Sequence, residues 1–335
     1  MNPLVKDGAA LGPLPARPMV TVIVPSFNQG KFIGRTLDSI VAQSYRPMEI
    51  LVMDGASTDE TVEILRAYSA RHLEIQWVSE KDDGVASAVN KGLDRAKGDI
   101  IGVQSSDDMY YAGAIKAAVD ALTRHPQCGL IYGDSDAIDV EDHYLAHYRV
   151  PEADWMALFG ISFCLPQQSI FMRRDVVDRV GHWNSAYYGC DLDYWLRMML
   201  AAPVARIPFT FSAWRMYPEQ RTQPARYRDI CDGYERMIMD NAQLRLAPWA
   251  VRRAARASCH LMRLRFPPID DVWRLRWHAL CALTLFPMFP VHSPSWIWRR
   301  LVPGYGLLIR IYRWMRPVRP VAPGPVVLPG SKSPQ

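Results

Sequence analysis

The stretch that decides the fold is GDIIGVQSSDD, residues 98–108. Its apolar run has the composition of a buried strand, and it ends in two adjacent carboxylates, Asp107 and Asp108. Like charges this close repel each other and resist burial, so they need solvent, a cationic side chain or a bound metal ion. Two interpretations follow: the pair holds a divalent metal ion and a diphosphate, or it forms a solvated turn in which Asp108 caps the next helix.

The sequence before this stretch alternates between strand and helix patterns. Runs rich in β-branched and apolar residues predict strands over 19–25, 48–53, 73–78 and 99–104. Helical patterns lie between them, at 33–41, after a cap at Ser57 or Thr58, and at 85–96. Repeated βα units of this kind predict an α/β fold with an open, mostly parallel, doubly wound sheet.

Three of these four strands end in side chains suited to ligand binding. The first is followed by Ser26 and Asn28, the second by Asp54, and the fourth by Asp107 and Asp108. If the strands are parallel, these groups lie along one edge of the sheet and can contact one ligand. The chain has neither a G-x-x-x-x-G-K-[ST] loop nor G-x-G-x-x-G after its first strand, which disfavours P-loop and dinucleotide sites. Such an acidic, glycine-poor site needs a metal ion to neutralise phosphate.

These motifs together resemble the family 2 inverting glycosyltransferases, from about residue 19 to residue 222. The stretches that carry the resemblance are VPSFN (24–28), LVMDGASTD (51–59), NKG (90–92), GDIIG (98–102), SDD (106–108), PQQSIF (166–171), VGHW (180–183) and DLDYWLR (191–197). The resemblance implies a GT-A fold and transfer of a sugar from a nucleotide diphosphate donor, with inversion at the anomeric carbon.

The resemblance also assigns a nucleotide-sugar site. Its residues would be Pro25, Ser26, Phe27, Asn28, Asp54, Asp82, Asn90, Lys91, Ser106 and Arg215. Within it, Asp54 would accept hydrogen bonds from the base or ribose, because a carboxylate only accepts. The simpler alternatives are that Asp54 closes its own Asx-turn and that Lys91 is a solvated helix lysine.

The metal site of the family matches Asp107, with Asp108 beside it as a second or supporting ligand. Mg²⁺ or Mn²⁺ fits, since hard cations take carboxylate and phosphate oxygens. Two positions depart from the family pattern. Ser105 stands where the first acid of the metal motif is expected, and Tyr217 stands where many relatives carry a histidine. Arg215 or Arg221 would supply the missing positive charge.

The catalytic base implied by the resemblance is Asp191, which opens the acidic pair before Trp195. It would take the proton of the acceptor hydroxyl on the face opposite the leaving group. Asp193 is the second choice, and either acid could instead be a helix N-terminal residue favoured by the macrodipole. Contacts to acceptor or sugar would come from Gln167, Gln168, Asp193 and Trp195.

The charge of the chain is divided. Residues 241–335 hold 15 Arg or Lys against Asp270 and Asp271, so this part carries +13 and the first 240 residues carry −8. Arginines interleave with tryptophans around residues 273–277, beside a short apolar stretch. We expect a basic helical region at 241–316 that attaches to an anionic membrane surface, rather than to nucleic acid. The structural alternative is a helical hairpin packed on the catalytic domain.

The remaining segments are less informative. Residues 1–18 are expected to be a flexible leader, 19–240 the catalytic domain, and 317–335 a proline-rich flexible tail. The six cysteines have no C-x-x-C spacing, which favours reduced thiols and disfavours a zinc site. We therefore expect a cytoplasmic protein, or one held peripherally at the cytoplasmic face of the inner membrane.

The function that these features favour is transfer of a sugar, most plausibly from a uridine diphosphate donor, to a hydroxyl of a membrane-associated glycan or lipid-linked acceptor. One alternative is a catalytically inactive scaffold of polysaccharide assembly, which Ser105, Tyr217 and Ser87 favour faintly. A nucleotidyltransferase is the other, although residues 25–30 lack the Gly/Lys/Arg-rich loop that a triphosphate requires.

Overall fold

The computed structural model describes residues 11–267 and 272–286, and within it the chain divides into two compact units. The first comprises Met1–Ala153 and Cys164–Arg221, and the second comprises Asp154–Phe163 and Thr222–Gln335. The second unit resumes at Thr222, ahead of the boundary expected at residue 240, and the helix of residues 227–240 packs with later helices. The expected proline-rich tail lies outside the described residues.

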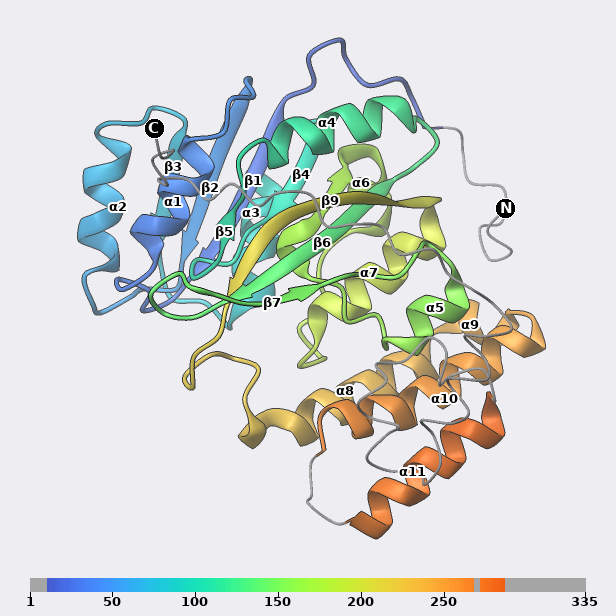
Figure 1. Ribbon diagram of the computed structural model, residues 1–335. Coiled ribbons are helices and arrows are strands. Elements are labelled where there is room, and N and C mark those ends of the chain that lie inside the picture. Colours follow the sequence, from blue (N-terminus) through green and yellow to red (C-terminus); the bar gives the residue numbers. More distant parts are fainter. Residues whose placement is uncertain (1–10, 268–271, 287–335) are drawn as a thin grey trace, which may run out of the picture. The chain divides into compact units, whose positions relative to one another are not determined.

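The first unit is built on a nine-stranded sheet in its described part (Figure 1). The strands are β1 (Val20–Ser26), β2 (Met48–Asp54), β3 (Ile75–Ser79), β4 (Ile100–Val103), β5 (Met109–Tyr110), β6 (Leu130–Ile138), β7 (Tyr144–Tyr148), β8 (Ile170–Arg173) and β9 (Val204–Arg215). They follow the order β3-β2-β1-β4-β8-β6-β9-β5, and β7 pairs with β6. The strands β1 to β4 pair in parallel, as the βα units predicted.

The other strands complete the sheet with mixed directions. β8 runs antiparallel between β4 and β6, while β6 and β9 are parallel to each other. β5, which directly follows the two carboxylates, is antiparallel to β9. This pairing matters for the site because it brings the end of β9 to the turn that contains Asp107 and Asp108.

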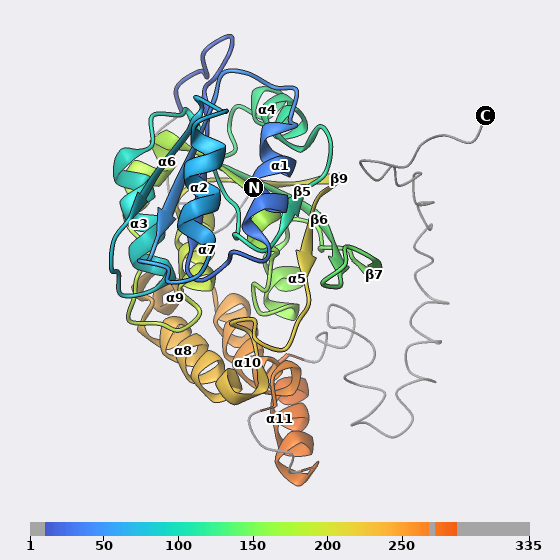
Figure 2. The same ribbon diagram turned by 90° about the vertical axis from the view of Figure 1, so that its left-hand side faces the viewer.

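Helices cover both faces of the sheet (Figure 2). They are α1 (Ile33–Val41), α2 (Thr61–Ser69), α3 (Val85–Arg95), α4 (Ala114–Arg124), α6 (Arg174–Val180) and α7 (Cys190–Ala201). α1, α2 and α4 pack their apolar side chains on the face formed by Val20, Val22 and Val24 of β1. α3 lies against Ile23 and therefore covers the opposite face, where Gly92 leaves no room for a Cβ atom. The alternation of buried side chains along β1 thus gives the layered α/β fold that was predicted.

Two predicted helix caps are wrong. α2 begins at Thr61, and the side chain that accepts its Thr61 N–H is Asp59, not Ser57 or Thr58. Asp108 does not cap α4 either, since that helix begins after Gly113, whose φ of 78° suits a residue without a side chain. In both places the expected capping group is used in a contact between loops, described below.

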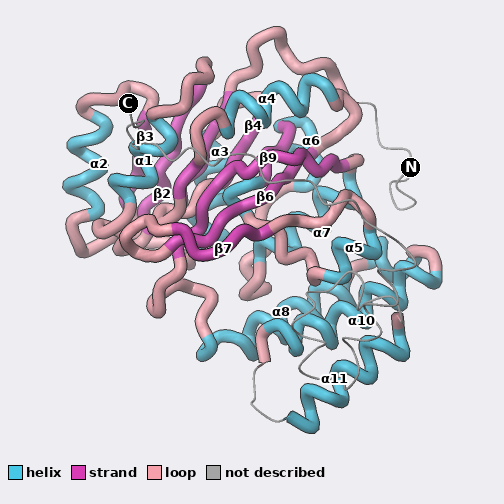
Figure 3. The backbone as a smooth tube through the Cα atoms, in the orientation of Figure 1, coloured by secondary structure: helices cyan, strands magenta, loops and turns pink. Residues whose placement is uncertain are grey.

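The second unit is helical in its described part, whereas the strands lie in the first unit (Figure 3). Its helices are α5 (Trp155–Gly160), α8 (Tyr227–Asp240), α9 (Ala242–Leu246), α10 (Trp249–Arg265) and α11 (Val272–Leu285). Asp154 caps α5 and Asn241 caps α9 through their side chains. The prediction of a helical basic region at the C-terminal side is confirmed.

α10 and α11 pack side by side, and one contact between them is polar. The Nδ1 atoms of His260 and His278 lie 2.9 Å apart. Burial lowers the pKa of both imidazoles, and with the neighbouring His260 it lowers the pKa of His278 to about 4. Two facing nitrogens at this distance share one proton, so at least one ring is neutral. Among the described residues, no helix is both long and apolar enough to cross a bilayer.

Candidate active site

The structure brings the predicted strand ends to one edge of the sheet. β1 lies between β2 and β4, and Ser26 stands opposite Asp54 in the register of β1 and β2. Pro25 is buried in the sheet opposite Met53, so it shapes this edge from below and presents no surface to a ligand. Phe27 is the opposite case, because its ring is 59% exposed directly after the strand.

The loop after β1 is fastened to the loop after β2. The backbone N–H of Asn28 donates to Ser57 Oγ at 2.7 Å, and Asn28 Oδ1 accepts from Thr58 N at 2.9 Å. The next two backbone N–H groups, of Gln29 and Gly30, donate to side chains of the same second loop. Asn28 adopts a φ of 51°, a left-handed conformation that asparagine tolerates better than most residues. The two loops therefore form one connected floor.

Asp54 is buried at the centre of this floor and closes its own turn. Its carboxylate accepts from the backbone N–H and hydroxyl of Ser57, at 2.9 and 2.5 Å, and from Ser79 Oγ at 2.6 Å. Three hydrogen-bond donors leave little of its accepting capacity for a base or ribose. The simpler alternative, a turn-closing aspartate, is what the structure shows. Asp54 would therefore act on a bound nucleotide indirectly, by holding Ser57, whose hydroxyl oxygen accepts from the backbone N–H of Asn28.

Asp82 reaches the same edge, whereas Asn90 and Lys91 are used elsewhere. A Cβ atom on Gly55 would lie 3.2 Å from both carboxylate oxygens of Asp82, so this glycine lets the acid close over the end of β2. Asn90 holds the backbone N–H and carbonyl of Trp183 with its amide. Lys91 forms an ion pair with Glu80. The structure therefore does not bring Asn90 or Lys91 to the nucleotide position.

Helix α1 and Gln167 contact the turn with the paired acids, residues 105–108. The hydroxyl of Thr36, a buried residue of α1, lies 2.9 and 2.8 Å from the carbonyl oxygens of Ser106 and Asp108. Ser106 is itself buried within the turn. On another side, Gln167 Nε2 reaches Ser105 Oγ at 3.5 Å. Gln167 thus lies beside the metal motif, while its neighbour Gln168 is buried.

Asp107 and Asp108 have different surroundings. Asp107 is partly buried, and its Oδ2 accepts a hydrogen bond from the Tyr217 hydroxyl at 2.7 Å. Asp108 is buried, and its Oδ1 accepts from the backbone N–H of Arg215 at 2.8 Å. Burial raises the pKa of both carboxyls, and the neighbouring Asp107 raises that of Asp108 further. Asp107 is consequently the accessible acid, and Asp108 is the internal support.

Tyr217 was recognised only as a departure from a pattern, and its contact was not predicted. Its hydroxyl also lies 3.4 Å from Gln29 Nε2, and its ring centroid is 5.0 Å from that of Phe32. Burial and the nearby Asp107 raise the pKa of the Tyr217 phenol, so it stays protonated and donates. Tyr217 thereby joins the loop after β1 to the metal motif.

Arg215 does not face a diphosphate, contrary to the role expected for it. Its side chain is 1% exposed, and its guanidinium donates to the carbonyl oxygens of Asp107 and Asp139 at 2.9 and 2.8 Å. It also forms an ion pair with Asp142 and lies over the Phe32 ring. These contacts fill its planar fork, because each needs a particular N–H direction. Arg215 is a structural link between two turns.

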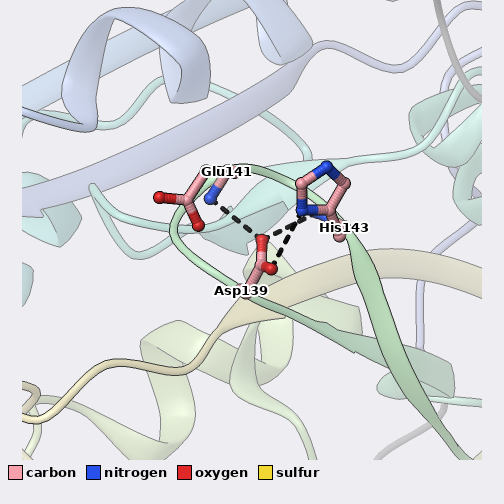
Figure 4. Close-up of side chains that lie close together, drawn as sticks. All are labelled: Asp139, Glu141 and His143. Carbon is pink, nitrogen blue, oxygen red and sulfur yellow. Dashed lines mark hydrogen bonds and ion pairs between the residues drawn. The ribbon is translucent and has the colours of Figure 1, made fainter.

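Another group of possible metal ligands, Asp139, Glu141 and His143, lies in the turn between β6 and β7 (Figure 4). Asp139 accepts hydrogen bonds from the backbone N–H groups of Glu141 and His143 and pairs with the His143 ring at 3.0 Å. The His143 backbone contact holds the pKa of Asp139 below its usual range. The acid is therefore used to close its own turn, and we assign no metal to this group.

Asp191 lies in the first turn of α7 and is partly buried. Burial raises the pKa of Asp191, and the positive charge of Arg221 acts in the opposite direction. Arg221 and Tyr188 exchange two hydrogen bonds. The Arg221 guanidinium donates to the Tyr188 carbonyl oxygen, and the Tyr188 hydroxyl donates to the Arg221 carbonyl oxygen. The loop after β9 thus carries both Tyr217, which contacts Asp107, and Arg221, which acts on Asp191.

Asp193 and Trp195 are not brought to this site. Asp193 is buried and forms an ion pair with Arg197, at 2.8 Å between Oδ2 and Nε. Trp195 has no exposed surface and packs edge-on against Trp183 and Tyr194. A side chain without exposed surface cannot stack on a sugar, so Trp195 belongs to the core of the unit. Of the two acids, Asp191 remains the candidate base.

The residues present fit a divalent cation at Asp107. Its carboxylate is a hard oxygen ligand, and Tyr217 holds it in one orientation, as hydrogen-bonding partners of metal ligands commonly do. Asp108 accepts a hydrogen bond from the backbone N–H of Arg215, and Ser105 stands where a second acidic ligand was expected. Asp107 is therefore the carboxylate available to the ion. Mg²⁺ and Mn²⁺ accept few protein ligands when phosphate and water complete the set.

The sequence of the chain also matches a known family over part of its length. Residues 21–181 match the family model described as glycosyl transferase family 2. A PGL/p-HBAD biosynthesis glycosyltransferase of Mycobacterium bovis (strain BCG / Pasteur 1173P2) is 30% identical over 174 residues, which are 51% of this chain and 66% of that protein. Chondroitin synthase of Escherichia coli is 28% identical over 130 residues, 39% of this chain and 19% of that protein. The match covers less than two thirds of either relative.

Solved structures show the same fold at low sequence identity. The mannosyltransferase PcManGT from Pyrobaculum calidifontis, in complex with GDP-Man and Mn²⁺, has a TM-score of 0.57 and 20% identity, covering 91% of this chain and 85% of that one. Residues 1–349 of TarS from S. aureus have a TM-score of 0.58 and 15% identity, covering 90% and 93%. The expected GT-A-type α/β fold is confirmed.

Proposed function

We propose that this chain, whose residues 21–181 match the glycosyl transferase family 2 model, moves a sugar from a nucleotide diphosphate to a hydroxyl group, with inversion at the anomeric carbon. The observation that carries this proposal is the Tyr217–Asp107 contact at the edge formed by β1, β2 and β4. It places an oriented carboxylate beside a preformed loop floor, as binding of a diphosphate requires. A uridine nucleotide is the first donor to test.

Asp191 is the proposed general base. An inverting transfer needs one group that takes the proton of the attacking hydroxyl, and a carboxyl with a raised pKa is a better proton acceptor than an exposed one. Arg221 acts in the opposite direction on the pKa of Asp191 and favours the ionised form that accepts the proton. The position of Asp191 in the first turn of α7 adds the favourable field of the helix N-terminus for the ionised form.

Asp107 is the proposed metal ligand, with Mg²⁺ or Mn²⁺ as the ion. The bound cation would neutralise the charge that builds on the departing nucleoside diphosphate. Tyr217 would fix the carboxylate of Asp107, and Asp108 would keep the turn in shape through Arg215. Phe27, Asn28, Ser57 and Asp82 lie where the nucleoside would be held, and Gln167 lies beside the metal motif.

The proposed acceptor is a membrane-associated glycan or a lipid-linked sugar. The basic, tryptophan-containing helices of the second unit support this choice, because they suit the headgroup region of an anionic membrane. The chain would then act peripherally at the cytoplasmic face of the inner membrane. Relatives that build complex carbohydrates, such as chondroitin synthase, are consistent with a role in polysaccharide biosynthesis.

The direct test is to measure nucleoside diphosphate release from a panel of UDP-, GDP- and dTDP-sugars, with and without Mn²⁺. We expect Asp191→Asn to lower transfer to an acceptor by roughly 10²–10⁴-fold while nucleotide affinity stays unchanged. Asp107→Asn should abolish the effect of the metal on nucleotide binding. Lys116→Gln, an exposed change on α4, serves as the control.

Four results would count against the proposal. Transfer close to wild type in Asp191→Asn would remove the proposed base, and activity that ignores chelators would remove the metal role of Asp107. If calorimetry detects no nucleoside diphosphate with or without Mn²⁺, an inactive scaffold becomes the better explanation. Consumption of a nucleoside triphosphate with release of pyrophosphate would indicate a nucleotidyltransferase.

A further inference from the structure

Helix α11 has one packed face and one exposed face. Ala279 and Ala282 are buried in the contact with α10. Trp273, Trp277 and Leu280 are 75%, 62% and 52% exposed. These positions are spaced by four and three residues, so the three large apolar side chains form one stripe along the helix. Exposed apolar side chains that gather on one face indicate an interaction surface more strongly than scattered ones do.

Arginines border this stripe. Arg274 and Arg276 are exposed on α11, and the Arg276 guanidinium lies 5.1 Å from the centroid of the Trp273 ring. The same pairing occurs at the start of α10, where Arg253 lies 4.6 Å from the ring of Trp249, itself 63% exposed. We call Trp273, Arg274, Arg276, Trp277 and Leu280 the α11 face.

Basic side chains dominate the two helices that carry the α11 face. Neither α10 nor α11 contains an aspartate or glutamate, and Arg252 and Arg256 of α10 are also exposed. Asp232 and Glu235 of α8 form ion pairs with Arg263, and Asp270 and Asp271 precede α11 in the sequence. A helix pair rich in arginine and tryptophan is complementary to a negatively charged surface that also accepts apolar groups.

A phospholipid bilayer with anionic headgroups has both properties. Tryptophan favours the headgroup level, where its ring is partly apolar and its N–H stays hydrated. Each arginine near such a surface contributes further attraction that depends on ionic strength. α11 has 14 residues and is too short to cross a bilayer, which requires about 20 residues, so it would lie along the surface.

We propose that the α11 face is the surface by which this chain docks on an anionic phospholipid membrane. This inference rests on the proposed function for its purpose, since docking would keep the enzyme beside a membrane-associated acceptor. The binding itself does not depend on catalysis. The aromatic stripe would enter the headgroup region, and Arg274 and Arg276 would contact phosphate groups beside it.

The experiment is co-sedimentation of the full chain with vesicles of phosphatidylcholine, alone or mixed with phosphatidylglycerol, at low and high salt. We expect binding to the mixed vesicles that weakens with salt. Arg274→Gln with Arg276→Gln should lower the partition constant by roughly 30-fold, at about fivefold for each charge. Trp273→Ser with Trp277→Ser should lower it at every salt concentration, because the loss is apolar.

Matched controls separate this face from general charge and hydrophobicity. Arg66→Gln with Arg71→Gln removes the same charge from the first unit, and Leu73→Ser removes an apolar side chain that is 93% exposed there. Both should bind vesicles as the wild type does. Circular dichroism of each variant checks that the helices remain folded. Donor hydrolysis in detergent should be the same for all of these variants.

The outcomes are distinct. If the α11 variants bind as the wild type does, or if the control variants lose binding equally, the inference is overturned. A shift of the tryptophan variant from dimer to monomer in light scattering would assign the face to a second copy of the chain and would also overturn it. Vesicle binding without hydrolysis of any sugar nucleotide would contradict the proposed function and leave the docking surface standing.

Discussion

The two acids proposed for catalysis are held in opposite ways. The turn with Asp107 is fixed by Thr36 of α1, by Arg215 at the end of β9 and by Tyr217 in the loop beyond it. Asp191 lies in the first turn of its own helix, and the charge of Arg221 opposes the rise that burial gives to its pKa. The proposed metal ion must be bound in one geometry, and the carboxylate proposed to hold it, that of Asp107, is fixed by these contacts. The proposed proton acceptor, Asp191, needs a suitable pKa more than a fixed orientation. The charge that adjusts this pKa comes from Arg221, in the loop after β9.

The strongest way to break this contrast is to remove the buried guanidinium. Arg215→Met should destabilise the sheet around β6 and β9 by about 3 kcal/mol, because Asp142 and the carbonyls of Asp107 and Asp139 lose their partner. Hydrogen exchange of peptides from these strands would measure the loss. The exposed change Arg66→Met should stay within about 0.5 kcal/mol of wild type. Equal protection in both variants would show that Arg215 is not a structural link.

Removing one hydroxyl tests the orientation of the metal ligand. Tyr217→Phe should weaken Mn²⁺ binding by roughly 10-fold or more, since loss of a hydrogen-bonding partner of a metal ligand has this effect. Calorimetry or electron paramagnetic resonance of Mn²⁺ with the nucleotide present would measure it. Tyr68→Phe is the matched control, because Tyr68 makes the same kind of contact with Asp38 at 2.8 Å. Unchanged affinity in Tyr217→Phe would refute the positioning role.

A smaller effect is expected at the helix that holds the turn. Thr36→Val keeps the shape of the side chain but leaves the carbonyls of Ser106 and Asp108 without this donor, at a cost of about 1–2 kcal/mol. Hydrogen exchange in the 100–111 segment would report it. Thr123→Val on α4, whose hydroxyl bonds within its own helix, should change stability less. Equal protection in the two variants would show that Thr36 does not hold the turn.

The smallest expected effect is a shift of pH dependence without loss of folding. Arg221→Gln removes the charge that opposes the raised pKa of Asp191, so that pKa should rise further. Since the base acts when deprotonated, the acidic limb of the kcat/KM profile should move to higher pH. Arg221→Lys retains the charge and should keep the limb near its wild-type position. A limb that stays in place in Arg221→Gln would separate Arg221 from the base.

Sequence reasoning predicted the parts of the site that depend on neighbouring strands. Apolar runs that end in Ser26, Asp54 and Asp107 were enough, because parallel pairing brings strand ends together. It could not assign Arg215 or Tyr217, which lie more than 100 residues from the acids that they contact. Their roles depend on the antiparallel pairing of β5 with β9, which no local pattern announces. Sequence reasoning also predicted that Trp195 contacts the sugar or the acceptor, whereas the structure buries it. The reason is related, since an aromatic residue has the same sequence signal in a core as in a binding site.

The paired histidines of α10 and α11 offer a reversible way to disturb the second unit without a mutation. The pKa of His278 is lowered to about 4 from an ordinary value near 6.5, so the folded state disfavours its proton. The stability that depends on the neutral pair is complete above pH 6.5 and is lost as the pH falls toward 4. A brief acid step should therefore loosen α11 from α10, and neutral buffer should restore the contact. Hydrogen exchange of residues 272–286 before, during and after the acid step would report this packing in one sample.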